Sequence, residues 1–302
     1  MRLNLLRWNL LRRKKNLKMN RQKSFENNNQ TLFLVPTPIG NLSEMTPRAI
    51  EVLNSVDIIA CEDTRNSGQL LKYFNIKKKL IAYENFNEVN SCKGIIKLLE
   101  EGNNVALISD AGYPLINDPG QRVVSEAVDK GFNVVSISGC NAMLNGLVAS
   151  GLIVQPFIFI GFLPSGNTDC LKKLEEYKKY PMTMVFYEAP HRIKRMMENC
   201  LQVFGDRKCC IARELTKLHE EYIRGTISEV IEVLDDIKGE MVVIVEGNNE
   251  IDTVSDDDII TKVNELVSIN VSKKDAIKRV AKELNINKNY VYDLVNKVSN
   301  NG

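Results

Sequence analysis

One loop constrains this chain more than any other segment: residues 109–120, with the sequence SDAGYPLINDPG. It follows an apolar run at 104–108 that predicts a buried strand, and it precedes residues 121–130, which predict an amphipathic helix. A connection from strand to helix needs only about two to six residues. We therefore expect the extra chain to form part of a binding site, because open α/β sheets bind ligands at the carboxyl ends of their strands. The alternative is an ordinary surface connection.

Strands and helices are predicted to alternate on both sides of this loop. Apolar runs predict a first series of strands at 31–36, 57–61, 80–83, 104–108 and 133–137. This alternation is typical of a mostly parallel sheet that helices cover on both faces. A second series begins near Gly151, with strands predicted at 157–161, 182–187, 208–213, 220–224 and 240–246 and helices at 168–179, 191–204 and 226–237.

The predicted fold class is α/β, with two α/β domains and a small helical module after them. The 302 residues, 44% of them hydrophobic, are enough to build two such cores. The expected divisions are a disordered basic extension at 1–30, domains at 31–150 and 151–247, an acidic linker at 248–258 and a helical module at 259–302.

Basic residues are concentrated at the two ends of the chain. Residues 1–24 contain nine Lys or Arg and no acid, and residues 271–302 contain seven Lys or Arg and three acids, although the formal net charge is only +2. Basic ends on a near-neutral body suit a polyanionic partner. The alternative is that these ends are simply solvated.

The cysteines and histidines argue against a metal site or a disulfide framework. Seven cysteines are dispersed without a CxxC pair, and only two histidines are present. Reduced thiols and a cytoplasmic location fit best. No apolar run reaches 18 residues, so no membrane partner is expected. The first eleven residues lack a clean signal-peptide pattern, which leaves a transit peptide, a frayed extension or a true start at Met19.

Phosphate-binding motifs are absent from the sequence. No GxGxxG follows the first strand and no GxxxxGK[ST] occurs, which argues against a dinucleotide or a nucleoside triphosphate. Other candidate corners follow predicted strands at 36–41, 138–141, 187–192 and 213–217. Each of them has a structural alternative, such as a rigid bend, a helix cap or a solvated ion pair. The residues alone leave a nucleoside ligand with few phosphates as the best hypothesis.

Six ordered motifs together resemble the ribosomal RNA small subunit methyltransferase I family, which belongs to the tetrapyrrole-methylase fold class. The resemblance extends from about residue 31 to residue 246. The motifs are VPTPIGNL at 35–42, CEDTR at 61–65, SDAGxPLIxDPG at 109–120, GFLP at 161–164, YEAPHR at 187–192 and RELTK at 213–217.

The resemblance implies S-adenosylmethionine as the methyl donor, bound between two α/β domains. It implies 2′-O-methylation of a cytidine ribose in the decoding region of small-subunit rRNA, with the rRNA or the small ribosomal subunit as partner. It also implies a homodimer in the cytoplasm. In an in-line transfer the protein's main contribution is to align the reacting atoms, which can supply roughly 7–11 kcal/mol of the barrier.

The resemblance also assigns the site residues. Glu188 and His191 are candidate proton acceptors, and Arg192, Arg213, Lys217 and the C-terminal lysines would offset phosphate charge. No metal ligand is expected. The catalytic set is Glu188, His191 and Arg192, and the cofactor-binding set is Pro36, Pro38, Gly40, Asp110, Ala111, Gly112, Tyr113, Leu115, Gly139, Cys140 and Asn141.

The sequence departs from the family pattern at residues 83–88, 113, 117, 138–141 and 165–167. These departures put the details of the cofactor pocket and some RNA contacts in question. Two alternative functions therefore remain open. One is a methyltransferase of the same fold that acts on a tetrapyrrole or a protein side chain. The other is a ribosome-binding assembly factor without catalytic activity.

Overall fold

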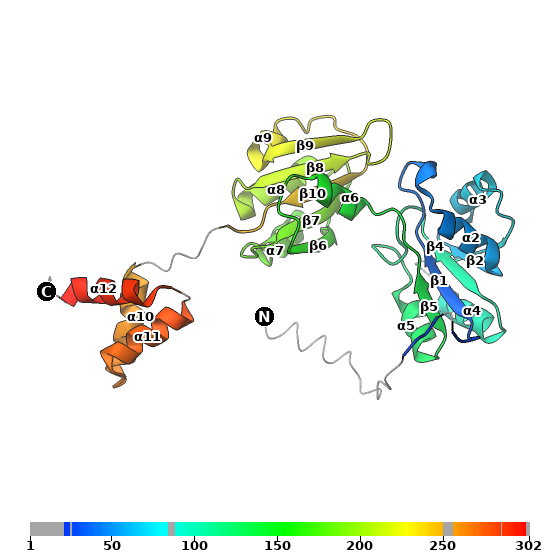
Figure 1. The fold of residues 1–302 in the computed structure, drawn as a ribbon. Coiled ribbons are helices and arrows are strands. Elements are labelled where there is room, and N and C mark those ends of the chain that lie inside the picture. Colours follow the sequence, from blue (N-terminus) through cyan, green and yellow to red (C-terminus); the bar gives the residue numbers. More distant parts are fainter. Residues whose placement is uncertain (1–20, 25, 84–87, 250–255, 285, 300–302) are drawn as a thin grey trace. The chain divides into compact units, whose positions relative to one another are not determined.

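The computed structural model describes the chain except for residues 1–20, 25, 84–87, 250–255, 285 and 300–302. The chain divides into two compact units, Met1–Gly247 and Asn248–Gly302. The first unit contains two β-sheets with their helices, and the second contains three helices (Figure 1).

The first sheet is entirely parallel, with the strand order β3-β2-β4-β1-β5. Two neighbouring inner strands, β2 and β4, have the apolar sequences IIAC and VALI, and all of their residues are buried. Continuous apolar runs of this kind are typical of strands that are covered on both faces. The strands are β1 (Thr31–Val35), β2 (Ile58–Cys61), β3 (Lys79–Ala82), β4 (Val105–Ile108) and β5 (Asn133–Ser136).

Helices pack on both faces of this sheet, as the sequence predicts. Alternate residues of the strands point to opposite faces, so that Ile59 packs with Leu53 of α2 while Leu107 packs with Leu99 of α4. Helix α2 begins cleanly because Thr46 caps it and Pro47 occupies its first position. The helical segments are η1 (Leu42–Glu44), α2 (Pro47–Ser55), α3 (Thr64–Tyr73), α4 (Glu88–Glu100), α5 (Gln121–Asp129) and α6 (Ala142–Ala149).

The second sheet is mixed, with the order β6-β7-β10-β8-β9. Only β6 and β7 are parallel, and the other three neighbouring pairs are antiparallel. Helices α7 and α9 end at residues 175 and 231, earlier than the predicted 179 and 237. The elements are β6 (Phe157–Phe162), α7 (Asn167–Glu175), β7 (Thr183–Glu188), α8 (Ile193–Phe204), β8 (Lys208–Arg213), β9 (Glu221–Thr226), α9 (Ile227–Ile231) and β10 (Met241–Val245).

Helix α6 joins the two sheets of the first unit. It follows β5 of the first sheet, but its Leu147 packs into a core with Val242 and Ile244 of β10. Gly146 allows a close approach, because a Cβ atom there would lie 3.1 Å from the Val242 side chain. The carboxyl ends of the first sheet are therefore brought next to the second sheet.

Residues 1–30 were expected to be a disordered extension, but part of this segment packs on the first sheet. Gln22 exchanges two hydrogen bonds of 2.9 Å with the backbone of Val134, and Asn27 bonds with Asn133. Both partners are on β5, the edge strand, whose outer backbone groups need a partner. Residues 1–20 lie outside the described part of the chain.

The described residues of the second unit form three helices, and the prediction of helices here is correct. Helix α10 begins inside the predicted linker, where three consecutive aspartates at its start complement the positive end of the helix dipole. Helices α11 and α12 are joined by only four residues, and the three helices share an apolar core. The helices are α10 (Asp256–Ser268), α11 (Lys273–Glu283) and α12 (Lys288–Ser299).

The contact between Gly139 and Pro36 gives a test of how the strand ends are held. A Cβ atom at Gly139 would lie 2.6 Å from Cγ of Pro36. We expect Gly139→Ala to lower the free energy of unfolding by about 1–3 kcal/mol, as overpacking does. Urea unfolding monitored by circular dichroism measures it. The control is Gly94→Ala on the exposed side of α4, where a Cβ atom meets nothing within 4 Å and should raise stability by about 1 kcal/mol. Equal stability of the two variants would contradict this account.

Candidate active site

Two loops at the carboxyl ends of β1 and β4 are joined by backbone hydrogen bonds. The N–H of Thr37 donates to the carbonyl of Gly112, and the N–H of Gly112 donates to the carbonyl of Thr37, both at 3.0 Å. The Thr37 hydroxyl also donates to the carbonyl of Ser109 at 3.0 Å. Gly112 has φ +75°, a conformation that favours glycine. The long loop is therefore fixed to the first-strand turn.

A cavity of about 380 Å³ opens beside this junction. Its walls come from the loops after β1, β4 and β5 of the first sheet and from β7, β10 and the loop after β8 of the second. Its size and mainly apolar lining suit a small organic ligand. The lining residues are Ile39, Asp110, Ala111, Gly112, Tyr113, Ile116, Asn117, Asp118, Asn141, Ala142, Phe162, Tyr187, Glu188, Ala189, Pro190, Leu215, Glu240, Met241 and Val242.

The predicted cofactor residues divide into three groups in the structure. A smaller cavity of about 180 Å³ is lined by Pro38 and Gly40, and it shares Asp110 with the large cavity. Five of the predicted cofactor residues line the large cavity: Asp110, Ala111, Gly112, Tyr113 and Asn141. The remaining four line neither cavity: Pro36, Leu115, Gly139 and Cys140.

The four residues outside both cavities contribute to the packing of the site. Pro36 and Gly139 are in contact, and the Gly139 N–H donates to the hydroxyl of Tyr113 at 3.1 Å. Leu115 covers Gly120, and the Cys140 thiol lies 3.5 Å from the carbonyl of Glu44. Their predicted binding role has no direct support in this geometry.

Of the three predicted catalytic residues, Glu188, His191 and Arg192, only Glu188 lines the cavity. Glu188 lines the cavity and is 2% exposed; its Oε1 accepts from the Ala189 N–H at 2.9 Å and lies 3.1 Å from Nε of Arg192. Burial raises the pKa of Glu188, and Arg192 opposes that rise. Oε2 of Glu188 is buried and has no hydrogen-bond partner among the described residues. His191 is exposed and is not part of the cavity wall.

Asp118 is a cavity residue that the sequence analysis missed. It lines the cavity near the end of the long loop, and burial raises the pKa of its carboxyl to about 6, with the negative charges of Glu62 and Asp110 adding to the rise. The motif itself contains this aspartate. The sequence could not show that two other carboxylates, one from the loop after β2, lie close enough to raise its pKa.

The charged groups of the cavity are all acidic. Its wall contains the four carboxylates of Asp110, Asp118, Glu188 and Glu240, and no Lys, Arg or His among the described residues. Three of the four have partners: Asp110 accepts from Asn66 at 2.9 Å, Glu188 contacts Arg192, and Glu240 contacts Lys217 at 3.2 Å. Such a lining favours a cationic ligand over an anionic one.

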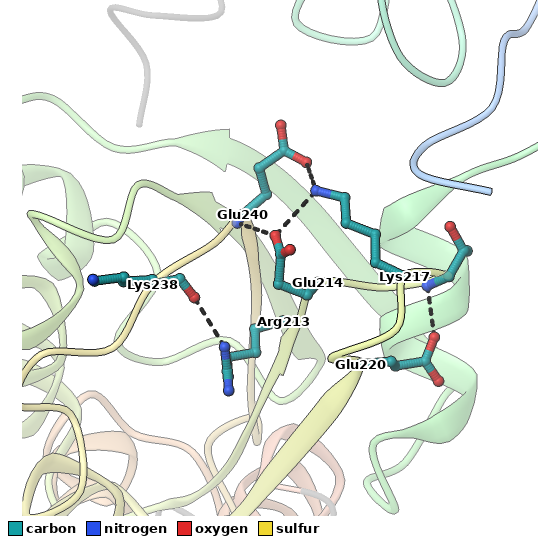
Figure 2. A network of polar contacts seen from close by, with 7 residues as sticks. Arg213, Glu214, Lys217, Glu220, Lys238 and Glu240 are labelled. Atoms are coloured by element: carbon teal, nitrogen blue, oxygen red, sulfur yellow. Dashed lines mark hydrogen bonds and ion pairs between the residues drawn. The ribbon is translucent and has the colours of Figure 1, made fainter. Parts of the chain in front are cut away.

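Figure 2 shows the network that fixes Glu240 and the loop after β8. Lys217 bridges Glu214 at 3.0 Å and Glu240 at 3.2 Å, and Glu214 also accepts from the backbone N–H of Glu240 at 3.1 Å. Lys217 holds the pKa of Glu214 below its usual value. Glu214 and Thr216 have positive φ angles, and left-handed backbone is costly for a β-branched residue such as threonine. The network therefore holds a strained loop against the cavity.

The three cations that were expected to offset phosphate charge have partners within the protein. Lys217 is occupied by two carboxylates, and Arg213 contacts Glu221 and the carbonyl of Lys238. Arg192 donates to the carbonyls of Leu163 and Pro164. These cations hold the protein together, because each already has partners within it.

The departures from the family pattern have local partners where the structure describes them. Tyr113 accepts the Gly139 N–H, and Asn117 lies against Gly161, where a Cβ atom would be 2.6 Å from Oδ1 of Asn117. Asn167 begins α7, and its Oδ1 accepts from the Asn199 amide at 2.9 Å. Residues 84–87 lie outside the described part of the chain.

Two kinds of feature are absent from the described residues. They contain no cluster of three His, Cys, Asp or Glu side chains that could hold a metal ion. They also contain no helix with both the length and the apolar character needed to cross a membrane.

Asp118 should destabilise the folded protein at neutral pH. Its pKa of about 6 lies above the ordinary value of about 3.9, so ionisation opposes folding as the pH rises through 6. We expect Asp118→Asn to raise the free energy of unfolding by about 1 kcal/mol at pH 7.5, after allowance for solvent screening, and by much less at pH 4.5. Denaturant unfolding at both pH values measures this.

Asp206→Asn is the matched control, with the opposite sign. Asp206 accepts from the N–H and hydroxyl of Ser228 at 2.8 and 2.7 Å, which lower its pKa. Its stabilisation is present above its unfolded pKa and is lost in acid, so this variant should lose more stability at pH 7.5 than in acid. A stability gain for Asp118→Asn that did not change with pH would contradict the assignment.

The sequence and the fold match known proteins over most of the chain. Residues 31–231 match the family described as Tetrapyrrole (Corrin/Porphyrin) Methylases. The protein named ribosomal RNA small subunit methyltransferase I of Bacillus subtilis (strain 168) is 45% identical over 285 residues, which cover 91% of this chain and 98% of that protein. The protein of the same name from Halalkalibacterium halodurans is 40% identical over 91% of this chain and 99% of its own.

Solved structures show the same fold at low sequence identity. The methyltransferase CobJ superposes with a TM-score of 0.55 at 17% identity, covering 72% of this chain and 94% of its own. Diphthine synthase superposes with a TM-score of 0.56 at 16% identity, covering 72% and 90%. These matches confirm the predicted fold class. The chain therefore belongs to the tetrapyrrole methylase family and, within it, to the ribosomal RNA small subunit methyltransferases I.

Proposed function

We propose that this protein transfers a methyl group from S-adenosylmethionine to the 2′-oxygen of a cytidine ribose in the decoding region of small-subunit rRNA. The observation that carries the proposal is the cavity with four carboxylates and no basic side chain among its described lining residues. Relatives named ribosomal RNA small subunit methyltransferase I, with 40–45% identity, support the RNA substrate.

The acidic lining of the cavity fits the net charge of S-adenosylmethionine, whose sulfonium and ammonium groups outweigh its single carboxylate. The carboxylates would offset these positive charges, and the partnerless Oε2 of Glu188 would accept a hydrogen bond from the ligand. Asp110 and Gly112 lie at the end of β4, where a nucleoside would reach backbone groups and a carboxylate acceptor. Apolar side chains of Ile39 and Leu215 would cover an adenine ring.

The protein's contribution to the reaction is mainly positional. When bound, the donor supplies an electrophilic methyl group. The Thr37–Gly112 junction and the Lys217 network hold opposite walls of the cavity, so the reacting atoms would be aligned without large loop movements. Such alignment supplies a large part of the barrier reduction in reactions of this kind.

Contacts to the RNA phosphates are proposed for the C-terminal unit. Lys274, Lys278 and Lys282 follow one another at helical spacing on α11, and all three are exposed. Exposed lysines at this spacing form a basic stripe suited to a phosphate backbone. This proposal gives residues to the role that the sequence analysis expected of the C-terminal lysines.

Homodimerisation and a cytoplasmic location also belong to the proposal. Leu144 and Val148 are 44% and 67% exposed on α6, and Ile153 just beyond is 63% exposed. Apolar side chains exposed together suit coverage by a second copy of the chain. All seven cysteines are free, which fits a reducing compartment.

Methyl transfer from labelled S-adenosylmethionine tests the function directly. We expect label on small ribosomal subunits, located at a 2′-oxygen in the decoding region when the modified nucleotide is mapped. Naked rRNA is tested in parallel. Cofactor binding without label on either RNA would contradict the substrate and favour a tetrapyrrole or a protein side chain. Absence of cofactor binding by calorimetry would favour an inactive assembly factor.

Glu188→Gln tests the contribution of the buried carboxylate to cofactor binding. We expect the free energy of S-adenosylmethionine binding to become less favourable by about 1.5–3 kcal/mol, because a charge-assisted hydrogen bond is lost. Isothermal titration calorimetry measures it. Glu198→Gln on α8 is the control, because Glu198 is exposed and is not part of the cavity wall. Equal losses in the two variants would argue against the assigned role.

The basic stripe on α11 predicts a change in salt dependence. The triple variant Lys274→Glu, Lys278→Glu, Lys282→Glu should bind small subunits more weakly. The slope of log affinity against log salt should become shallower by about 0.7–0.9 for each phosphate that is no longer neutralised. The control reverses the same number of exposed lysines in the first unit, Lys77, Lys79 and Lys93. An unchanged slope for the α11 variant would exclude this surface from RNA binding.

A further inference from the structure

Asp118 differs from the other three carboxylates in the cavity wall because it has no partner among the described residues. Asp110 accepts from Asn66, Glu188 contacts Arg192, and Glu240 contacts Lys217. In the described part of the chain, no hydrogen bond or ion pair engages the carboxylate of Asp118. The other candidates for a proton acceptor are less suitable, because Glu188 is beside a guanidinium and His191 is outside the cavity wall.

Acidic and phenolic groups surround Asp118. Glu62, after β2, and Asp110, after β4, face it with like charge. Tyr83, after β3, lines a small void of about 10 Å³ with it, and Tyr187 on β7 lies close enough to sense its charge. None of these groups is a cation. A carboxylate in such surroundings has a raised affinity for a proton.

We infer that Asp118 is the group that accepts the proton of the substrate hydroxyl during methyl transfer. The inference rests on the proposed function and adds a catalytic residue to it. The bond between the 2′-oxygen and the methyl carbon forms as the carbon–sulfur bond breaks. The bonding pair of the broken bond goes to sulfur, and the hydroxyl proton passes to the carboxylate of Asp118.

The charge balance of the cavity drives this proton transfer in the right direction. Before transfer, a sulfonium bound in the cavity would favour the ionised forms of the carboxylates. Transfer would remove that charge, because the sulfur becomes a neutral thioether. The like charges of Glu62 and Asp110 would then act on Asp118 without an opposing cation from the donor's sulfur, so the proton affinity of Asp118 would rise as the hydroxyl proton is released. A partnerless carboxylate responds most strongly to this change.

Single-turnover methyl transfer to small subunits between pH 5 and 8.5 is the first test. We expect the wild-type rate to rise with pH and then to level off, with a midpoint below the pKa of about 6 that Asp118 has in the ligand-free protein, because a bound sulfonium favours the ionised carboxylate. Asp118→Asn should be slower by about 100-fold or more and should lose this pH dependence. A rate within threefold of wild type, or the same midpoint in the variant, would overturn the inference.

Glu62→Gln provides a second variant that keeps the proposed base. It removes a like charge that faces Asp118, so the midpoint of the wild-type profile should move to lower pH. Glu188→Gln, by comparison, should leave the midpoint at its wild-type value, because Glu188 does not contribute to the raised pKa of Asp118. If Glu62→Gln leaves the midpoint unchanged while Glu188→Gln moves it, the titrating group is Glu188 and the inference is wrong.

Calorimetry with the donor gives a readout that does not depend on RNA. Ionised Asp118 favours a cation nearby, so the affinity for S-adenosylmethionine should increase up to about tenfold from pH 5 to pH 7. The affinity for S-adenosylhomocysteine, which lacks the sulfonium charge, should increase less. Asp118→Asn should remove most of the difference between the two ligands. If Asp118→Asn lowered the affinity for S-adenosylmethionine by more than about 100-fold at pH 5, Asp118 would instead be a cofactor ligand.

The outcomes separate this inference from the function on which it rests. If wild-type protein binds the donor but labels no RNA, the proposed function fails and the inference fails with it. If wild-type protein labels RNA and Asp118→Asn does so at a similar rate, only the inference is overturned. Circular dichroism of each variant confirms that the comparison is made between folded proteins.

Discussion

The two backbone hydrogen bonds between Thr37 and Gly112 are the contact on which the site depends. Each loop alone is a connection after a strand, and nothing in a parallel sheet fixes one such loop to another. The bonds join the first-strand turn to the long loop, and the Thr37 hydroxyl adds a third link at Ser109. Asp110 is thereby held between the two cavities, with Pro38 and Gly40 on one side and Tyr113 on the other.

The opposite wall depends on α6 and on the Lys217 network. Helix α6 carries the chain out of the first sheet and packs on β10, which places Val242 and Glu240 next to the long loop. Lys217 then connects Glu240 with Glu214, while its stem contacts Gly40, where a Cβ atom would lie 2.5 Å from its Cγ. A single lysine thus neutralises acidic groups and packs the two walls together.

Much of the fold follows from local pattern. The runs IIAC and VALI predicted buried parallel strands, because burial follows from a few consecutive apolar residues. The ends of α7 and α9 were misjudged, since polar residues at helix ends do not show where the last turn gives way to a loop. The packing of Gln22 and Asn27 on β5 also escaped prediction, because it depends on which strand is at the sheet edge.

The site was less predictable than the fold, for a physical reason. Asp110 and Glu188 stood out because they follow predicted strands, and both line the cavity. Asp118 did not, since its character comes from Glu62, which is more than fifty residues away in the chain. Arg213 and Lys217 looked like free cations in the sequence. In three dimensions Arg213 pairs with Glu221, and Lys217 pairs with Glu214 and Glu240, as Figure 2 shows for Lys217. Long-range electrostatics cannot be read from local spacing.

The acidic lining has a consequence for what the cavity rejects. Adenosine is shared by the proposed donor and by the adenine nucleotides, so shape alone separates them poorly. A nucleotide would bring two to four negative charges towards Asp110, Asp118, Glu188 and Glu240. Repulsion between like charges in a partly desolvated site costs several kcal/mol. The same four side chains that would attract a sulfonium would thus disfavour binding of ATP and its products without any dedicated blocking residue.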